Sequence, residues 1–240
     1  MRTVAVVLAG GTGERFGTPG PKQLLPLAGR PMIEYSVAAF EQAPGIDSIL
    51  VVMVAGYRQQ VSDLLGGRYR KVGAIIDGGP ARTDSTRRAI AELADGDRGD
   101  GGRGDGDRDV LFHDAARPLV SQQTIAGCVA ALAEHRAVGV AVPSSDTVAV
   151  VSDGVMTAIP RRDSLVRCQT PQGFRLSVIR RAYELAAADP GFGDLPATDD
   201  CGIVLHYLPD VPVHVVPGSE RNIKITYPRD LAIAEALLRE

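Results

Sequence analysis

The sequence contains no tryptophan, and aromatic residues make up only 5% of its 240 residues. Proteins that hold single-stranded nucleic acid stack the bases on aromatic side chains, and this chain is too poor in them to build such a surface. Its 26 Lys and Arg residues are outnumbered by 29 Asp and Glu residues, which leaves a formal net charge of −3. The chain therefore lacks the basic field of a nucleic-acid-binding protein, and we expect its important cations to act locally on a small anion.

Cysteine and long apolar runs are also scarce. The three cysteines, Cys128, Cys168 and Cys201, are odd in number and far apart, and no His/Cys cluster has zinc spacing. No apolar run reaches membrane-spanning length, and glycines rather than a cleavage site follow Val4–Leu8, so this run predicts a buried strand and no secretory signal. These features predict a cytoplasmic protein without a membrane partner.

Apolar residues make up 45% of the chain, which is enough for a sizeable core. Continuous β-rich runs alternate with helical periodicity, a pattern typical of a mostly parallel α/β sheet with helices on both faces. The expected strands are Val4–Leu8, Ser48–Val54, Val72–Ile76, Val110–His113, Val138–Val142 and Val211–Val216. The expected helices are Met32–Glu41, Arg58–Leu65, Thr86–Leu93, Thr124–His135, Leu176–Ala188, a helix starting at Asp199, and Pro228–Leu238.

Two segments depart from this alternation. Residues 95–109 contain only Asp, Gly and Arg, so they have nothing apolar to bury and predict a solvated loop. The RGD triplets inside this segment arise readily by chance in such a composition and carry little weight as an adhesion signal. Residues 147–159 predict a β-hairpin that turns at Ser152-Asp153-Gly154 and forms a protruding arm, a device often used for dimerisation.

The most informative motif directly follows the first strand. It runs from Leu8 to Gly17 as LAGGTGERFG and is followed by Pro21-Lys22-Gln23. Glycines at the carboxyl end of a parallel strand let backbone N–H groups approach a polyanion, and Arg15 and Lys22 add two cations beyond them. The pattern is neither a Walker A loop nor GxGxxG, and by itself it also fits a plain Gly-rich turn.

Further polar segments follow later strands. Residues 76–85 (IDGGPARTDS) precede a helix that Ser85 could cap. Asp114, in HDAARP at the end of the Val110–His113 strand, could bind a ribose hydroxyl or hydrated Mg²⁺, or form a structural ion pair with Arg117. The remaining segments, each also explicable as a cap or turn, are Pro160–Asp163, Gln169–Phe174, Ala197–Asp200 with Thr198 as a possible N-cap, and Arg221–Thr226.

Taken in this order, the segments resemble the 2-C-methyl-D-erythritol 4-phosphate cytidylyltransferase family of the non-mevalonate isoprenoid pathway. The resemblance runs from Val4 to Leu238, outside residues 95–109, and rests on LAGGxGxRFG, PKQ, HDAARP, QTPQ, TDD and NIKIT. It implies one Rossmann-like, nucleotide-diphospho-sugar transferase domain over residues 1–240. It also implies CTP and a small polyol phosphate as substrates, Mg²⁺ bound through the CTP phosphates, and a homodimer through the arm.

The resemblance also implies a role for individual residues. Arg15 and Lys22 match the cations that stabilise the transition state. The positions that match the CTP site are Ala9, Gly10, Gly11, Gly13, Gly79, Ser85 and Asp114, with Asp114 also a candidate metal ligand. The positions that match the polyol phosphate site are Thr147, Arg162, Thr198, Lys224 and Arg117, with Thr147 and Arg162 supplied by the partner subunit's arm.

Two departures from the family pattern bear on specificity. Pro80 stands where the family commonly has Asp, and it has no N–H to offer the base. Asp146-Thr147 lacks the lysine that usually follows this pair. Ribitol-5-phosphate cytidylyltransferases share the same plan, so ribitol phosphate stays open as the acceptor.

Two alternatives come from other functional classes. One is a nucleotidyltransferase for another base or a sugar 1-phosphate, and the other is a non-catalytic dimeric binding protein. The five cations and carboxylates Arg15, Lys22, Asp114, Arg162 and Lys224 argue against the last.

Overall fold

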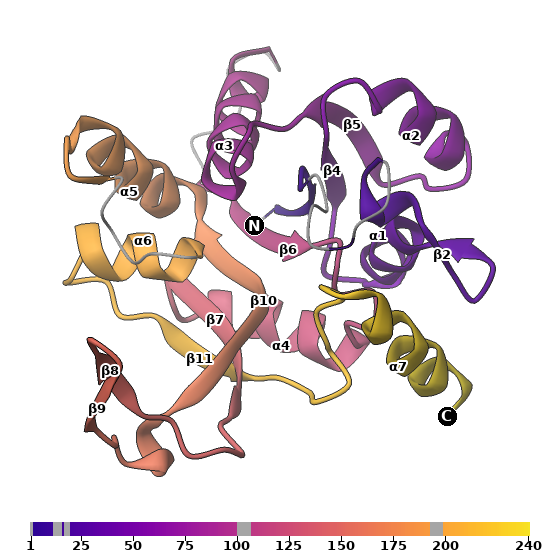
Figure 1. Cartoon of the computed structure of the whole chain (residues 1–240). Helices are drawn as coiled ribbons and strands as arrows, with labels where there is room; N and C mark the ends of the chain where they lie inside the picture. The colour runs from indigo at the N-terminus through magenta and orange to yellow at the C-terminus, as the bar shows by residue number, and fades with distance from the viewer. Residues whose placement is uncertain (1, 12–15, 17–19, 100–106, 193–198) are drawn as a thin grey trace.

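In the computed structural model, the described residues are 2–11, 16, 20–99, 107–192 and 199–240. Within them a seven-stranded sheet has the order β11-β7-β10-β6-β1-β4-β5 (Figure 1). The strands are β1 (Thr3–Ala9), β4 (Ser48–Met53), β5 (Val72–Asp77), β6 (Asp109–Asp114), β7 (Ala137–Pro143), β10 (Val166–Arg175) and β11 (His214–Pro217). Within this sheet only β10 runs antiparallel to its described neighbours, so the predicted mostly parallel α/β architecture is confirmed.

Helices cover both faces of this sheet. One layer holds α3 (Arg82–Gly99), α5 (Leu176–Ala188) and α6 (Asp200–Tyr207), and the other holds α1 (Met32–Gln42), α2 (Arg58–Leu65) and α4 (Gln122–Leu132). Strand β1 shows why the sequence gives this arrangement. Its side chains alternate between the two layers, and all seven of its residues are buried. A strand covered on both sides therefore appears in the sequence as an unbroken apolar run.

The last helix, α7 (Pro228–Arg239), packs away from the two main layers. A small third core joins it to the short hairpin of β2 (Pro26–Leu27) and β3 (Arg30–Pro31). The buried members of this core are Phe16, Leu27, Met32, Ile225 and Ala234. Apolar packing thus brings the C-terminal segment against the front of the chain.

Strand register places three of the sequence motifs at one edge of the sheet. Leu8 pairs with Asp114 across β1 and β6, and Met53 of β4 pairs with both Ala9 and Asp77. The loops that follow β1, β5 and β6 therefore leave the sheet side by side. This carboxyl edge is where open α/β sheets bind their ligands.

Several elements differ from the sequence prediction. Strand β11 begins at His214, three residues after the predicted start at Val211. Strand β10 lies between β6 and β7, although its QTPQ segment was expected to be a loop. Helix α3 begins at Arg82 and continues to Gly99, and Asp109 opens β6. The predicted loop over 95–109 is therefore wrong at both of its ends. Once Ile90 and Leu93 anchor α3 in the core, each further helical residue adds a hydrogen bond without a new nucleation cost. Residues 100–106 lie outside the described part of the chain.

A hairpin stands where the arm was predicted. Its strands, β8 (Val150–Ser152) and β9 (Val155–Ala158), pair only with each other among the described residues and are shorter than the 147–159 pattern suggested. Asp153 and Gly154 connect them with φ angles of 50° and 78°. Two successive residues with positive φ match the twist of a two-residue hairpin turn, which explains the Asp-Gly sequence.

Candidate active site

The loops after β1 and β5 touch through Ser85. A Cβ atom added to Gly10 would lie 2.5 Å from the Ser85 hydroxyl oxygen, and one added to Gly78 would lie 2.8 Å from it. A side chain at either position would collide with the Ser85 hydroxyl, so glycine lets both loops pack against Ser85. The N–H of Gly79 donates to the same hydroxyl at 3.1 Å, and the hydroxyl donates to the Ala81 carbonyl at 3.2 Å.

This contact brings together most of the residues predicted for the nucleotide. Ala9 ends β1, and Gly10 and Gly11 follow it. Gly79 in the β5–α3 connection and Ser85 in the first turn of α3 lie opposite this loop. Ser85 lies inside the first turn of α3, so its predicted role as the cap of that helix is wrong. Gly13 lies outside the described residues.

Lys22 connects the front of the chain to its C-terminal segment. It sits in the short helix η2 (Lys22–Leu24) with 9% of its surface exposed, and its amine donates to the Ile225 carbonyl at 2.7 Å. The N–H of Ile225 in turn donates to the Ala116 carbonyl at 2.8 Å. The PKQ, HDAARP and NIKIT segments therefore meet in one place, as a shared phosphate site requires. Arg15, the other predicted catalytic cation, lies outside the described residues.

Asp114 holds two cations, one on each carboxylate oxygen. Its Oδ1 atom lies 3.1 Å from the Arg82 Nε atom, and its Oδ2 atom lies 2.7 Å from the Lys224 Nζ atom. Burial alone would raise the pKa of Asp114, but Arg82 and Lys224 outweigh that cost and hold the pKa below its usual range. Asp114 is therefore an anion between two cations at the end of β6.

The predicted alternative for Asp114, a structural ion pair with Arg117, is wrong. Arg117 instead donates to the carbonyl oxygens of Asn222 at 2.7 Å and Cys168 at 3.4 Å. Asn222 itself is buried and donates from its amide nitrogen to the Thr170 carbonyl at 2.9 Å. These bonds tie the HDAARP loop, β10 and the C-terminal segment into one unit.

His113, the residue before Asp114, is locked as a neutral imidazole. Its Nε2 atom lies 3.0 Å from the Arg117 carbonyl, which can only accept, so this nitrogen carries the proton. Its Nδ1 atom therefore accepts from the Thr170 hydroxyl at 3.0 Å, and that hydroxyl accepts from the Asp114 N–H at 3.1 Å. Burial lowers the pKa of His113 to about 4. With both ring nitrogens engaged, His113 shapes the loop and is no general base.

Strand β10 positions the start of α6 through Gln172. Its side-chain oxygen accepts from the N–H groups of Asp200 at 3.0 Å and Cys201 at 3.1 Å, and its nitrogen donates to Asp199 at 2.8 Å. Asp199 caps α6 by accepting from the Gly202 N–H at 2.9 Å, so the N-cap expected at Thr198 is one residue further along. Thr198 itself lies outside the described residues. Sequence reasoning missed Arg82, Gln172 and Asp200, because a cation ahead of the predicted helix Thr86–Leu93 and polar residues in the QTPQ and TDD segments match ordinary turns and caps.

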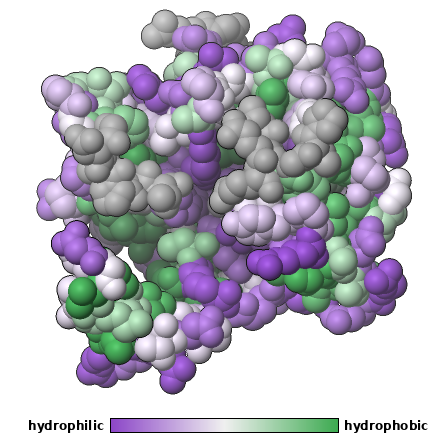
Figure 2. Space-filling model, viewed as in Figure 1, coloured by the Kyte–Doolittle hydropathy of each residue, from purple (hydrophilic) through white to green (hydrophobic). Residues whose placement is uncertain are grey.

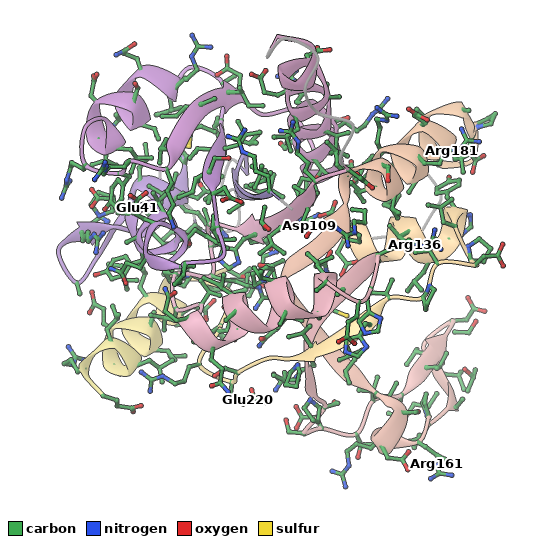
Figure 3. All side chains as sticks on the ribbon, turned by 180° about the vertical axis from the view of Figure 1, so that it is seen from behind. Glu41, Asp109, Arg136, Arg161, Arg181 and Glu220 are labelled. Carbon is green, nitrogen blue, oxygen red and sulfur yellow. The ribbon has the colours of Figure 1, made fainter. Side chains whose placement is uncertain are left out.

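The arm residues do not join this cluster. Thr147 and Arg162 are exposed, and Arg162 donates to the Ser145 carbonyl at 3.2 Å. Figure 1 shows the arm projecting beyond β7 and β10, away from α7. In the rear view, the neighbouring Arg161 points outward with its side chain 84% exposed and pairs with Asp163 at 2.5 Å (Figure 3).

The arm carries an unusual amount of exposed apolar surface. Figure 2 shows apolar atoms gathered on it, at the lower left of the molecule. The exposed fractions are 49% for Val150, 56% for Val151, 64% for Val155, 71% for Met156 and 64% for Ile159. A two-stranded hairpin with such a surface has little to stabilise it within one chain.

The described residues contain no group of three or more His, Cys, Asp or Glu side chains able to hold a metal ion. Asp114 is the acidic residue at the centre of the cluster, and both of its oxygens already face protein cations. No described helix is long and apolar enough to cross a membrane.

Comparison with known proteins settles the family. The family model for 2-C-methyl-D-erythritol 4-phosphate cytidylyltransferase, IspD, matches residues 3–240. The chain belongs to the IspD family. A relative of that name from Thermobifida fusca is 53% identical, and the match covers 99% of this chain and 94% of the relative.

Two further matches, one to a solved structure and one to a ribitol enzyme, show how far the similarity extends. The crystal structure of a 4-diphosphocytidyl-2C-methyl-D-erythritol synthase from Anaerococcus prevotii is 26% identical with a TM-score of 0.83, over 100% of this chain and 96% of that one. A bifunctional ribulose 5-phosphate reductase/CDP-ribitol pyrophosphorylase from Haemophilus influenzae is 36% identical over 99% of this chain, which matches 48% of that protein. Both the methylerythritol and the ribitol branches thus share this sequence plan.

Proposed function

We propose that this chain transfers CMP from CTP to 2-C-methyl-D-erythritol 4-phosphate. The products are 4-diphosphocytidyl-2-C-methyl-D-erythritol, an isoprenoid precursor of the non-mevalonate pathway, and pyrophosphate. One structural observation carries the proposal. The Lys22 amine, from near the start of the chain, is bonded to Ile225, the residue after Lys224, and Lys224 itself contacts Asp114 at the carboxyl edge of the sheet. Membership of the IspD family and the high identity to a cytidylyltransferase of that name support the substrate pair.

The chemistry requires positioning and charge, and no proton acceptor. A phosphate oxygen of the acceptor attacks the α-phosphorus of CTP in line, and the bond to the pyrophosphate oxygen breaks. Because a phosphate monoester is already largely dianionic near neutral pH, its oxygen needs no base, in keeping with the locked neutral state of His113. Lys22 and Arg15 would oppose the charge that gathers around the α-phosphorus.

On the nucleotide side, backbone groups are the proposed ligands. Gly10, Gly11 and Gly13 offer N–H groups to the triphosphate, and Ala9, Gly79 and Ser85 surround the cytosine. The close contact of Gly10 with Ser85 supports these roles, because it requires a residue without a side chain at the start of the loop. Pro80 offers only its carbonyl oxygen, so the base must be recognised through its neighbours.

The donor set fits a Mg²⁺ ion that arrives with the triphosphate. Mg²⁺ commonly binds through one or two carboxylates plus substrate phosphates, and Asp114 is the carboxylate placed to contribute. When bound, the ion would neutralise charge on the phosphate oxygens. Because Asp114 also contacts Lys224 through its Oδ2 atom, the carboxylate would share its charge between the ion and this amine.

The acceptor side is proposed to be shared between two subunits of a cytoplasmic homodimer. Lys224, Thr198 and Arg117 would contact the polyol phosphate from one subunit. Thr147 and Arg162, exposed on the arm, would reach it from the partner. The apolar arm surface supports this dimer, because burial against a second copy would remove it from water.

Ribitol 5-phosphate is the second candidate acceptor, favoured by the similarity to the CDP-ribitol pyrophosphorylase. The arm lacks the lysine that usually follows Asp146-Thr147, so the acceptor end departs from the pattern of methylerythritol enzymes. Pyrophosphate release from CTP should be measured with each acceptor at equal concentration, and then with the other three NTPs. We expect turnover with CTP and methylerythritol phosphate. Preference for ribitol phosphate, or for another nucleotide, would overturn the assignment.

A further inference from the structure

Arg82 lies at the start of α3 and bridges two carboxylates. Its Nε atom lies 3.1 Å from Asp114 Oδ1, and its Nη1 atom lies 2.9 Å from Asp200 Oδ2. Burial alone would lower the pKa of Arg82, but Asp200 and Asp114 together raise it above its usual range. The guanidinium is therefore a permanent cation whose position is set by two anions from different parts of the fold.

Asp200 is a rigid anchor for this cation. Its side chain is completely buried, and its Oδ1 atom accepts from the Tyr183 hydroxyl of α5 at 2.7 Å. Its backbone N–H is held by Gln172 of β10. Contacts from α5, α6 and β10 therefore hold Asp200 in place, and Asp200 in turn fixes the position of the Arg82 guanidinium.

Asp114 divides its charge between this bridge and Lys224. Arg82 occupies one oxygen of Asp114, and the amine of Lys224, a side chain that is 41% exposed, occupies the other. A carboxylate that already has one buried cation attracts a second one less strongly. Without Arg82, the full charge of Asp114 would fall on Lys224 and hold its amine more tightly.

We propose that Arg82 is a positioning residue for cytidylyl transfer: by holding Asp114 against Asp200, it keeps Lys224 available for the acceptor phosphate. The inference rests on the proposed function, because it assigns to Lys224 a phosphate of the reaction. It adds the first residue of α3 to the acceptor side of the site. A guanidinium suits the task because its fork reaches two carboxylates at once, which a lysine amine cannot do with the same geometry.

The test compares steady-state kinetics of the wild-type enzyme and Arg82→Lys, with both substrates varied. We expect the KM for the acceptor phosphate to rise about tenfold, as for a coupling lost between contacting residues, while the KM for CTP changes less than about twofold. Arg87→Ala is the matched control, because Arg87 is an exposed arginine on the same helix. Its kinetics should match the wild type.

A double-mutant cycle separates positioning from simple support of the fold. Since Arg82 acts through Asp114 on Lys224, Arg82→Lys should raise the acceptor KM in the wild type but add nothing in a Lys224→Ala background. An equal rise in the KM values for both substrates, or full additivity with Lys224→Ala, would overturn the proposal.

A second variant controls for misfolding, because a change that leaves one partner of a buried ion pair without its counter-charge destabilises the folded protein. Arg82→Gln combined with Asp200→Asn removes both charges and keeps groups that can hydrogen-bond. It should show the same selective rise in acceptor KM. If the wild-type enzyme itself fails to use CTP and either acceptor, the proposed function fails. If the wild type is active and both variants bind the acceptor normally, only the role of Arg82 fails.

Discussion

The amine of Lys22 donates a hydrogen bond of 2.7 Å to the carbonyl oxygen of Ile225, a residue 203 positions later in the chain. This bond fixes the side chain of Lys22 beside the NIKIT segment, whose own lysine contacts Asp114. A fixed cation stabilises developing negative charge without the cost of reorganising at the moment of reaction. The pairing therefore explains how a lysine of the front loop can serve the chemistry.

Lys22→Ala should lower kcat by about 10²–10³, as removal of one preorganised donor does in other enzymes. Single-turnover kinetics with saturating CTP would measure the chemical step directly. Lys71→Ala is a close control, because the Lys71 amine also donates to a backbone carbonyl, that of Ala43 at 2.7 Å, just before β5 begins. Near-normal turnover in Lys22→Ala, with only a weaker affinity for CTP, would remove Lys22 from the catalytic step.

Gly79→Ala should disturb the nucleotide loop. The added Cβ atom would lie 2.2 Å from the Asp84 Cβ atom, so the loop or the start of α3 must move. We expect a loss of about 1–3 kcal/mol in the free energy of unfolding and a raised KM for CTP. Gly73→Ala on β5 is the control, because nothing lies within 4 Å of its added Cβ. Denaturant titration and CTP kinetics should be measured on both variants. The same free energy of unfolding and the same KM for CTP in Gly79→Ala and Gly73→Ala would contradict the close packing at Gly79.

His113 should make the protein less stable as the pH falls from 6.5 to 4. In the folded protein the pKa of His113 is lowered to about 4, whereas in the unfolded chain it returns to 6.5. Between these values the unfolded chain binds more protons, so acid favours unfolding. At 1.36 kcal/mol for each pKa unit, the full loss is about 3 kcal/mol. Denaturation midpoints across this pH range should show a flatter profile for His113→Gln, and an unchanged slope in that variant would refute the role of His113.

Met156→Asp should dissociate the proposed dimer. Met156 is 71% exposed on the arm, and burying such a side chain contributes about 1.5–3 kcal/mol. Because a symmetric dimer would contain the change twice, we expect its Kd to weaken at least about a hundredfold by sedimentation equilibrium. Ser152→Asp places the same charge at an exposed polar position of the same hairpin and should leave the dimer intact. A monomeric wild type, or a dimer unaffected by Met156→Asp, would exclude the arm as the interface.

The sequence predicted the parallel part of the sheet because those strands are continuous apolar runs. It failed at β10, whose residues VRCQTPQGFR mix polar side chains with a proline. This strand is buried through hydrogen bonds instead of apolar packing alone. Gln172, for example, is 2% exposed because three polar groups of the α6 start surround its amide. Such partners are distant in the sequence, so no local sequence pattern predicts them.

Part of the candidate site was also predictable. The glycines after β1 and the acidic end of β6 follow from the rule that parallel strands present their carboxyl ends together. The partners of Asp114 could not be inferred this way. Arg82 opens α3 and Lys224 lies near the C-terminus, and only the folded chain shows that both contact the same carboxylate. The roles predicted for Arg15, Gly13 and Thr198 stay predictions, since these residues lie outside the described part of the chain.

The place of β10 between β6 and β7 has a consequence for the nascent chain. On the ribosome, β6 and β7 emerge before β10 exists, so the gap between them must stay open until residues 166–175 have been made. While the arm is being synthesised, β6 exposes one unpaired edge and β7 exposes two, because β11 is made later still, and such edges invite pairing with other chains. Late insertion of β10 should therefore be the step at which chaperones or a lower growth temperature most improve the yield of this protein.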